Sequence, residues 1–230
     1  MEARIDTAHE VWNSHWAEPG ERAKWRRPEL VVVDYITALR ARGARRVLDV
    51  GAGIGRHALT YARAGLDVVA SDASPKGLAA LRASAAAEDV AIGIGTWSFS
   101  ELPMVAASVD HVLAWNVIYH GDGTLVRHAL VEFHRILREH GTVQCTMLST
   151  RHRAYGTGHE IRPDTFVDPA STGEKAHAHF YVDETTLVAM LHDAGFEVLS
   201  LDDTDQDPPG GWHWTVLAAR QTGTVQRVAR

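Results

Sequence analysis

Residues 47–56 read Val-Leu-Asp-Val-Gly-Ala-Gly-Ile-Gly-Arg, and this stretch is the strongest indication of the fold of the chain. An apolar run that breaks into closely spaced glycines predicts a β-strand, a tight turn and then a helix. Gly51 and Gly53 permit the sharp turn and leave no Cβ between the main chain and a ligand. The next apolar run ends at Asp72, about 20 residues further on, where a carboxylate suits the two hydroxyls of an adenosine ribose. Together these features predict a site for a nucleoside cofactor.

Two classes of cofactor use such a turn. Dinucleotide enzymes carry G-x-G-x-x-G, in which the third glycine allows close packing and the helix N-terminus faces a pyrophosphate. Here Arg56 stands at the third-glycine position. Asp49 lies two residues before the first glycine, where its charge would repel a pyrophosphate but suits a cationic ligand. A nicotinamide cofactor is therefore the less favoured alternative.

The spacing of residues 47–56 resembles motif I of the class I S-adenosylmethionine (SAM) methyltransferases, and Asp72 resembles the ribose acid of motif II. The resemblance extends over about residues 45–220. It implies an α/β fold, a doubly wound, mostly parallel seven-stranded sheet with a C-terminal antiparallel hairpin. It also implies that a methyl group passes from SAM to a small-molecule acceptor by in-line displacement, with S-adenosylhomocysteine (SAH) as product. The glycines followed by Arg56 and His57 resemble the tellurite-resistance type of small methyltransferase.

The length of the chain predicts one domain over residues 1–230, and the resemblance implies that it is a methyltransferase domain. Residues 1–44 are expected to form N-terminal helices or a lid, with helices over 4–17 and 28–42. The SAM-binding core, 45–148, is expected to place strands at 45–50, 67–72, 90–95, 109–115 and 142–148 around helices at 56–64, 75–87 and 123–140. Residues 149–182 lack a convincing period and predict a substrate-side insertion. A helix over 183–194 and strands at 196–201 and 212–219 complete the C-terminal part, 183–220, before a tail at 221–230.

The composition is that of an ordinary globular protein. The chain has 230 residues, of which 45% are hydrophobic and 23% charged, and its net charge of −6 argues against a nucleic-acid partner. The single cysteine, Cys145, fits a reducing cytoplasm. No apolar run approaches the roughly 20 residues that span a bilayer, and the N-terminus does not resemble a signal peptide. We therefore expect a cytoplasmic protein without membrane contact; the sequence does not predict an oligomeric state.

The resemblance assigns the cofactor to the carboxyl ends of the predicted strands, where open α/β sheets bind ligands. Trp97 is expected to stack on adenine, or else to be an ordinary packed aromatic; many family members carry an acid nearby, which this chain lacks. Asn116 is expected to contact the methionine end of SAM. The tryptophans of the N-terminal segment, Trp12, Trp16 and Trp25, either close over the cofactor or join the leading helices to the sheet. The expected cofactor contacts are Trp16, Asp49, Gly51, Ala52, Gly53, Asp72, Ala73, Thr96, Trp97, Ser98 and Asn116.

Catalytic candidates follow the fourth predicted strand. His120 is the candidate general base because imidazole titrates near neutral pH, and Tyr119 accompanies it; the alternative for His120 is a plain hydrogen-bonded residue. Arg56 and His57 are expected at the mouth of the active site, although Arg56 could instead pair with an acid such as Asp49. The expected substrate-binding residues are Arg56, His57, Tyr155, His159, Glu160, His179, Tyr181, Trp212 and Trp214.

The histidines in and near the insertion are candidate ligands for a metal ion. His177 and His179 share one face if they lie on a strand, and His120, His159, Glu160 and His213 occur in or near the same part of the chain. Their spacings match no ligand signature, and no run of acids follows the fourth strand to hold magnesium. We therefore expect no metal and favour a polar, aromatic substrate pocket. A SAM-binding sensor or partner protein without catalysis remains open as a further alternative.

Overall fold

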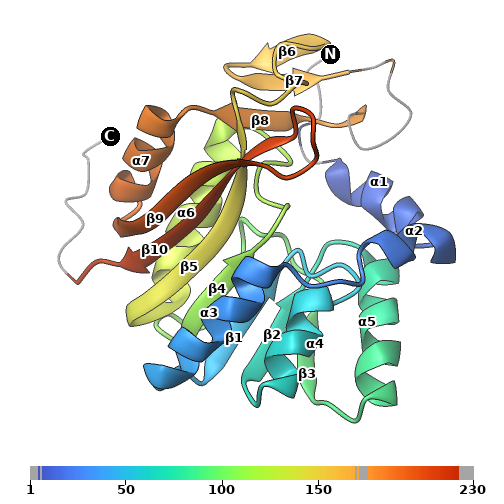
Figure 1. The fold of residues 1–230 in the computed structure, drawn as a ribbon, viewed down its shortest axis with the longest axis vertical. Helices are drawn as coiled ribbons and strands as arrows, with labels where there is room; N and C mark the ends of the chain where they lie inside the picture. The colour runs from blue at the N-terminus through green and yellow to red at the C-terminus, as the bar shows by residue number, and fades with distance from the viewer. Residues whose placement is uncertain (1–4, 6, 169, 171–175, 223–230) are drawn as a thin grey trace.

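A computed structural model describes residues 5, 7–168, 170 and 176–222, and all structural statements concern these residues. The elements alternate between strands and helices through the first half of the chain, as the periodicity predicts (Figure 1). The helices are α1 (Ala8–His15), α2 (Pro19–Lys24), α3 (Leu30–Ala41), α4 (Arg56–Arg63), α5 (Pro75–Ala87), α6 (Gly123–Ile136) and α7 (Glu184–Asp193). The strands are β1 (Arg46–Val50), β2 (Asp67–Ser71), β3 (Ile92–Gly95), β4 (Val109–Ala114), β5 (Leu137–Ser149), β6 (His159–Arg162), β7 (Thr165–Val167), β8 (His179–Val182), β9 (Phe196–Asp205) and β10 (Trp212–Arg220).

The sheet confirms the predicted fold class. Strands β3, β2, β1, β4 and β5 pair in that order and run parallel, while β10 lies antiparallel against β5 and β9 antiparallel against β10. Helices cover both faces (Figure 1), because α3, α4 and α5 bury their apolar sides in one cluster and α6 and α7 bury theirs in the other. The parallel strands are therefore buried on both sides, as their near-continuous Val, Ile and Leu content requires.

The number of strands is a correction to the prediction. The expected seven strands are present, but residues 149–182 add β6, β7 and β8, so the sheet has ten. Strand β8 pairs in parallel with the end of β5, where Leu148 lies opposite Tyr181, and β7 and β6 follow antiparallel. These strands are short, and pairing of β8 with β5, of β7 with β8 and of β6 with β7 stabilises them rather than a local period, which is why the sequence pattern missed them.

Several boundaries also differ from the prediction. Helix α6 ends at Ile136 and β5 already begins at Leu137, because the backbone of Leu137 is extended, with φ −67° and ψ 140°. The short helix α2, which begins with Pro19, was not predicted. Residues 4 and 6 of the first predicted helix and residues 223–230 of the predicted tail lie outside the described residues. No helix in the described part of the chain is long and apolar enough to cross a membrane.

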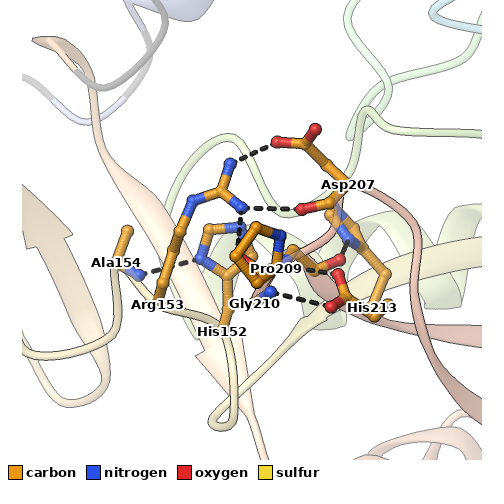
Figure 2. Close-up of polar contacts among 9 residues, drawn as sticks. His152, Arg153, Ala154, Asp207, Pro209, Gly210 and His213 are labelled. Atoms are coloured by element: carbon orange, nitrogen blue, oxygen red, sulfur yellow. Dashed lines mark hydrogen bonds and ion pairs between the residues drawn. The ribbon is translucent and has the colours of Figure 1, made fainter.

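Arg153 connects the start of the insertion to the turn between β9 and β10 through hydrogen bonds and an ion pair (Figure 2). Its guanidinium donates to the carbonyl oxygens of Asp207 at 2.7 Å and Pro209 at 2.8 Å and pairs with the Asp207 carboxylate. Its backbone N–H donates to the carbonyl of Gly210 at 2.8 Å. The insertion is therefore held at its first residues by the C-terminal hairpin.

Candidate active site

The loop after β1 is shaped by glycines in the left-handed region. Gly51, Gly53 and Gly55 have φ values of 66°, 54° and 86°, which residues with a Cβ rarely adopt. A Cβ on Gly53 would lie 2.9 Å from the ring of Trp16, and one on Gly51 would lie 2.3 Å from a methyl of Val117. The loop can therefore pack against Val117 and Trp16 in this conformation only because these positions carry no side chain.

Asp72 joins this loop to the start of α5. One carboxylate oxygen accepts the N–H of Gly53 at 2.7 Å, and the other accepts the N–H of Ser74 at 2.7 Å. Burial raises the pKa of Asp72, and the two backbone bonds act in the opposite direction. Each carboxylate oxygen has a second lone pair, so the group can still accept a pair of ribose hydroxyls.

A cavity of about 320 Å³ lies at the carboxyl ends of β1, β2, β3 and β4. Its volume falls within the range of small-molecule sites, and its position is the one at which open parallel sheets bind ligands. Its wall comprises Ala8, His9, Trp12, Trp16, Trp25, Val50, Gly51, Ala52, Gly53, Ile54, Arg56, His57, Asp72, Ala73, Thr96, Trp97, Ser98, Phe99, Trp115, Asn116, Val117 and His120.

Most of the expected cofactor contacts border this cavity. Trp16, Gly51, Ala52, Gly53, Asp72, Ala73, Thr96, Trp97, Ser98 and Asn116 belong to its wall. Asp49 does not belong to it. That carboxylate is 2% exposed, burial raises its pKa to about 7, and its Oδ2 is a buried atom without a hydrogen bond. A buried acid without a full set of partners beside the loop suits a cationic ligand better than a pyrophosphate.

The N-terminal tryptophans form the remaining wall. Trp12 stacks on Trp16 with 5.2 Å between ring centroids, and Trp25 contacts both rings edge-on. Trp16 also packs against Gly77 of α5, where a Cβ would lie 2.9 Å from its ring. Both alternatives from the sequence stay open for this group, because the rings border the cavity and also pack the first helices against α5.

Arg56 and His57 reach the cavity from the first turn of α4. The guanidinium of Arg56 pairs with Glu29 at 2.9 Å and lies 5.2 Å from the ring centroid of Trp25, so its ion pair is with Glu29 and not with Asp49. The ring of His57 accepts the backbone N–H of Glu29 at 3.2 Å. Burial lowers the pKa of His57 well below its usual value, so this imidazole is neutral at physiological pH.

The segment after β4 is fixed by hydrogen bonds to β5. Asn116 has a left-handed φ of 57°, its N–H donates to the hydroxyl of Thr146 at 2.7 Å, and its side-chain oxygen accepts that hydroxyl at 2.9 Å. The carbonyl of Asn116 accepts a ring N–H of His120 at 3.2 Å. The other ring nitrogen of His120 lies 2.9 Å from His177. His120 therefore borders the cavity with both ring nitrogens bonded to protein.

The remaining candidates lie outside the cavity wall. Tyr119 is buried behind His120, with 4.6 Å between ring centroids. His159 and Glu160 are exposed on β6, and Tyr155 is bonded to Asp164 at 2.8 Å. His179 and Tyr181 are buried on β8, Trp212 lies under the guanidinium of Arg151, and the Trp214 indole donates to the Val182 carbonyl. The structure thus brings His120, Arg56 and His57 together but not the insertion and β10 residues.

Sequence reasoning did not name seven of the wall residues, which are Ala8, His9, Val50, Ile54, Phe99, Trp115 and Val117. Ala8 and His9 come from α1, Phe99 follows the adenine-side segment, and Val117 follows Asn116. Phe99 and Val117 directly neighbour predicted contacts, so the strand ends alone could have indicated them. Ala8 and His9 carry no such signal, because only the packing of α1 on α5 brings them to the site.

Comparison with known proteins agrees with this geometry. Residues 47–141 match the family described as a methyltransferase domain. Over this stretch, which is 95 of the 230 residues, the chain resembles the class I SAM-dependent methyltransferase superfamily. The cofactor of this superfamily is SAM, and its product is SAH.

The curated relatives are similar to this chain over less than half of its length. An uncharacterized methyltransferase of Mycobacterium tuberculosis is 42% identical over 98 residues, and one of Mycobacterium bovis matches equally. The match covers 43% of this chain and 37% of the length of those relatives. The resemblance to the tellurite-resistance subgroup stays a prediction.

Solved structures share the fold over nearly the whole chain. A Burkholderia thailandensis 1,6-didemethyltoxoflavin-N1-methyltransferase superposes with a TM-score of 0.68 at 22% identity, covering 96% of this chain and 92% of its own. The magnesium protoporphyrin IX methyltransferase of Synechocystis superposes with a TM-score of 0.67 at 16% identity, covering 96% of this chain and 100% of its own. At these identities the likeness establishes the fold alone.

Proposed function

We propose that this chain transfers a methyl group from SAM to a small-molecule acceptor, as an enzyme of class EC 2.1.1. The main support for the proposal is the glycine loop, which is hydrogen-bonded to Asp72 at the floor of a cavity. Gly53 and Asp72 are joined at 2.7 Å, and both border the same space. Together with the buried Asp49, this arrangement suits a ligand with a ribose at one end and positive charge at the other.

The fit to SAM can be assigned residue by residue. Asp72 would hold the ribose, Trp97 with Thr96 and Ser98 would hold adenine, and the loop after β1 together with Asn116 would hold the methionine end. When bound, SAM supplies an electrophilic methyl group on a sulfonium, which a lone pair of the acceptor displaces in line. The tryptophans of the first helices border the cavity on the other side, where they would help to exclude water from the bound reactants.

Positioning is the main contribution that these residues make to the reaction. Holding two reactants in contact can supply roughly 7–11 kcal/mol of a barrier, so a dedicated base is not required. Where the acceptor must lose a proton, His120 is the imidazole at the cavity. Its Nε2 is bonded to the Asn116 carbonyl and its Nδ1 to His177, so His120 would take up a proton at Nδ1 only after its contact with His177 is released.

The acceptor class that the cavity favours is a flat, partly apolar molecule. Aromatic rings line much of the space, among them Trp12, Trp25, Phe99 and Trp115. Rings prefer offset-stacked or edge-on contacts with other rings, which favours a heteroaromatic acceptor. The solved neighbours named above act on a toxoflavin precursor and on magnesium protoporphyrin, and both names are consistent with this proposal.

Calorimetric titration with SAM and SAH, with NAD as comparator, tests the cofactor. We expect binding of SAM and SAH but not NAD, and loss of binding in Asp72→Ala. The matched control is Asp67→Ala, an exposed aspartate at the opposite end of the same strand. Binding of NAD alone, or of none of the three, would overturn the proposal. Release of SAH that depends on an added heteroaromatic acceptor separates an enzyme from a SAM-binding sensor.

A further inference from the structure

Three histidines meet behind one wall of the cavity. His120 follows β4, His177 precedes β8, and His179 is the first residue of β8. All three are buried, with 3%, 2% and 1% of their surface exposed. One ring nitrogen from each lies within 4.8 Å of the other two, and Nε2 of His177 is 2.9 Å from Nδ1 of His120. Only His120 also borders the cavity.

For two of these rings, a backbone carbonyl determines which nitrogen carries the hydrogen. Nε2 of His120 lies 3.2 Å from the carbonyl of Asn116, and Nδ1 of His179 lies 2.9 Å from the carbonyl of His177. A carbonyl oxygen can only accept, so both of these nitrogens carry the hydrogen of a neutral ring. Nδ1 of His120 and Nε2 of His179 therefore present lone pairs. A backbone carbonyl behind the ring is the usual outer partner of a metal-binding histidine.

We propose that His120, His177 and His179 bind one divalent transition-metal ion of the zinc type. The donors would be Nδ1 of His120 and Nε2 of both His177 and His179. On binding, the hydrogen on Nε2 of His177 would move to its Nδ1, so that all three ligands are neutral imidazoles. Imidazole nitrogens suit zinc, cobalt and nickel, whereas magnesium and calcium prefer oxygen ligands, which this set lacks. Three protein donors leave one position of a tetrahedral ion for water or an acceptor heteroatom.

The sequence alone could not reveal this set. His177 and His179 form only a short His-x-His pattern, and the third histidine lies 57 residues before the first of them. The pairing of β8 with the end of β5 brings the two parts together, beside the segment that follows β4. The expectation of no metal rested on spacing, and the three-dimensional arrangement is what now favours one.

The ion would join the insertion to the methyltransferase core next to the cavity. His120 belongs to the segment after β4, whereas His177 and His179 belong to the insertion. The ring centroids lie 4.8 Å apart for His120 and His177 and 4.4 Å apart for His177 and His179, so small side-chain movements suffice for common ligation. The inference goes beyond the proposed function, because binding of the ion does not require SAM.

Metal titration of the full chain tests the site. Protein stripped with a chelator is titrated with Co²⁺, and then with Zn²⁺, in the absence of SAM. We expect one ion per chain, an intense visible d–d absorption typical of four-coordinate Co²⁺, and loss of that absorption when Zn²⁺ displaces it. His177→Gln and His179→Gln should each weaken Zn²⁺ binding by about 100-fold. His159→Gln, an exposed histidine of the same insertion, should bind as the wild type does.

The wild-type protein decides the matter even where a glutamine variant fails to fold by circular dichroism. A wild-type chain that takes up no ion, or that shows only the weak absorption of six-coordinate Co²⁺, would overturn the proposal. Folded variants that bind Zn²⁺ as tightly as the wild type would overturn it too. A chain that binds SAM but no metal would overturn this inference and leave the proposed function standing, so the two failures are distinguishable.

Discussion

Replacing Asp49 with asparagine should change how stability depends on pH. Burial raises the pKa of this carboxyl from 3.8 to about 7. Between these values the folded chain keeps a proton that the unfolded chain has lost, so the free energy of unfolding falls as pH rises. The penalty is absent below the unfolded pKa and complete above about pH 7, where it amounts to about 4 kcal/mol. The neutral amide introduced by Asp49→Asn would carry no such penalty at any pH.

The size of the effect between two accessible pH values follows from the same pKa pair. At pH 5 the penalty is roughly 1.7 kcal/mol and at pH 8 roughly 4.3 kcal/mol, so the stability of Asp49→Asn relative to wild type should rise by about 2.6 kcal/mol. Taking the difference between the two proteins removes groups that titrate equally in both. It also removes any constant cost of placing an amide beside the backbone N–H of Ala58.

Urea unfolding of both proteins at half-unit steps from pH 5 to pH 8, followed by tryptophan fluorescence, measures this difference. Asp34→Asn, which removes an exposed aspartate of α3, controls for the loss of one negative charge. A difference for Asp49→Asn that stays flat across this interval would refute the reasoning. It would mean that water or a rearranged partner stabilises the charged carboxylate in the folded state.

Two further substitutions test the loop and the core. Gly53→Ala should abolish SAM binding in calorimetry and should lower the free energy of unfolding more than Gly65→Ala does. Both glycines have a left-handed backbone. A Cβ at Gly53 would lie 2.9 Å from the ring of Trp16, whereas a Cβ at Gly65 would have nothing within 4 Å. Gly65→Ala should cost only the backbone strain, about 1–2 kcal/mol in urea unfolding, and an equal cost at both positions would contradict this. Thr142→Val should lower the free energy of unfolding by about 1–3 kcal/mol, because the fully buried His111 loses the hydroxyl that lies 2.9 Å from its Nδ1. An unchanged midpoint of urea unfolding would contradict that hydrogen bond.

The parts of the fold that the sequence predicts well are those with a local period. Strands β1, β2 and β4 are apolar runs bounded by turns, and Ser74 before Pro75 marks the start of α5, where its hydroxyl accepts the Gly77 N–H. Each of these signals lies within a few residues of the element that it predicts. The strands of the insertion carry no comparable signal, because β8 is defined by its pairing with β5 and β6 is exposed.

The cofactor side and the expected substrate side of the site also differ in how well the sequence predicts them. Cofactor-side positions such as Asp72 and Asn116 follow strands, and the carboxyl ends of parallel strands meet at one edge of the sheet, so sequence position alone brings them together. Trp212 and Trp214 depend on how β10 packs against its neighbours. Trp214 is turned into the core, where its indole N–H donates to the Val182 carbonyl at 2.9 Å. No pattern within β10 specifies that partner.

The boundary of the family match coincides with a division within the cavity. Every wall residue from Val50 to His120 lies inside the matched stretch, residues 47–141, and every other wall residue lies on or beside the first two helices, between Ala8 and Trp25. The floor therefore lies within the stretch that matches the family model, and the wall of tryptophans lies outside it. An acceptor that enters against that wall would be selected by residues 8–25 and by His120. One ring nitrogen of His120 faces His177 of the insertion, so the acceptor side would join the matched stretch to two segments outside it.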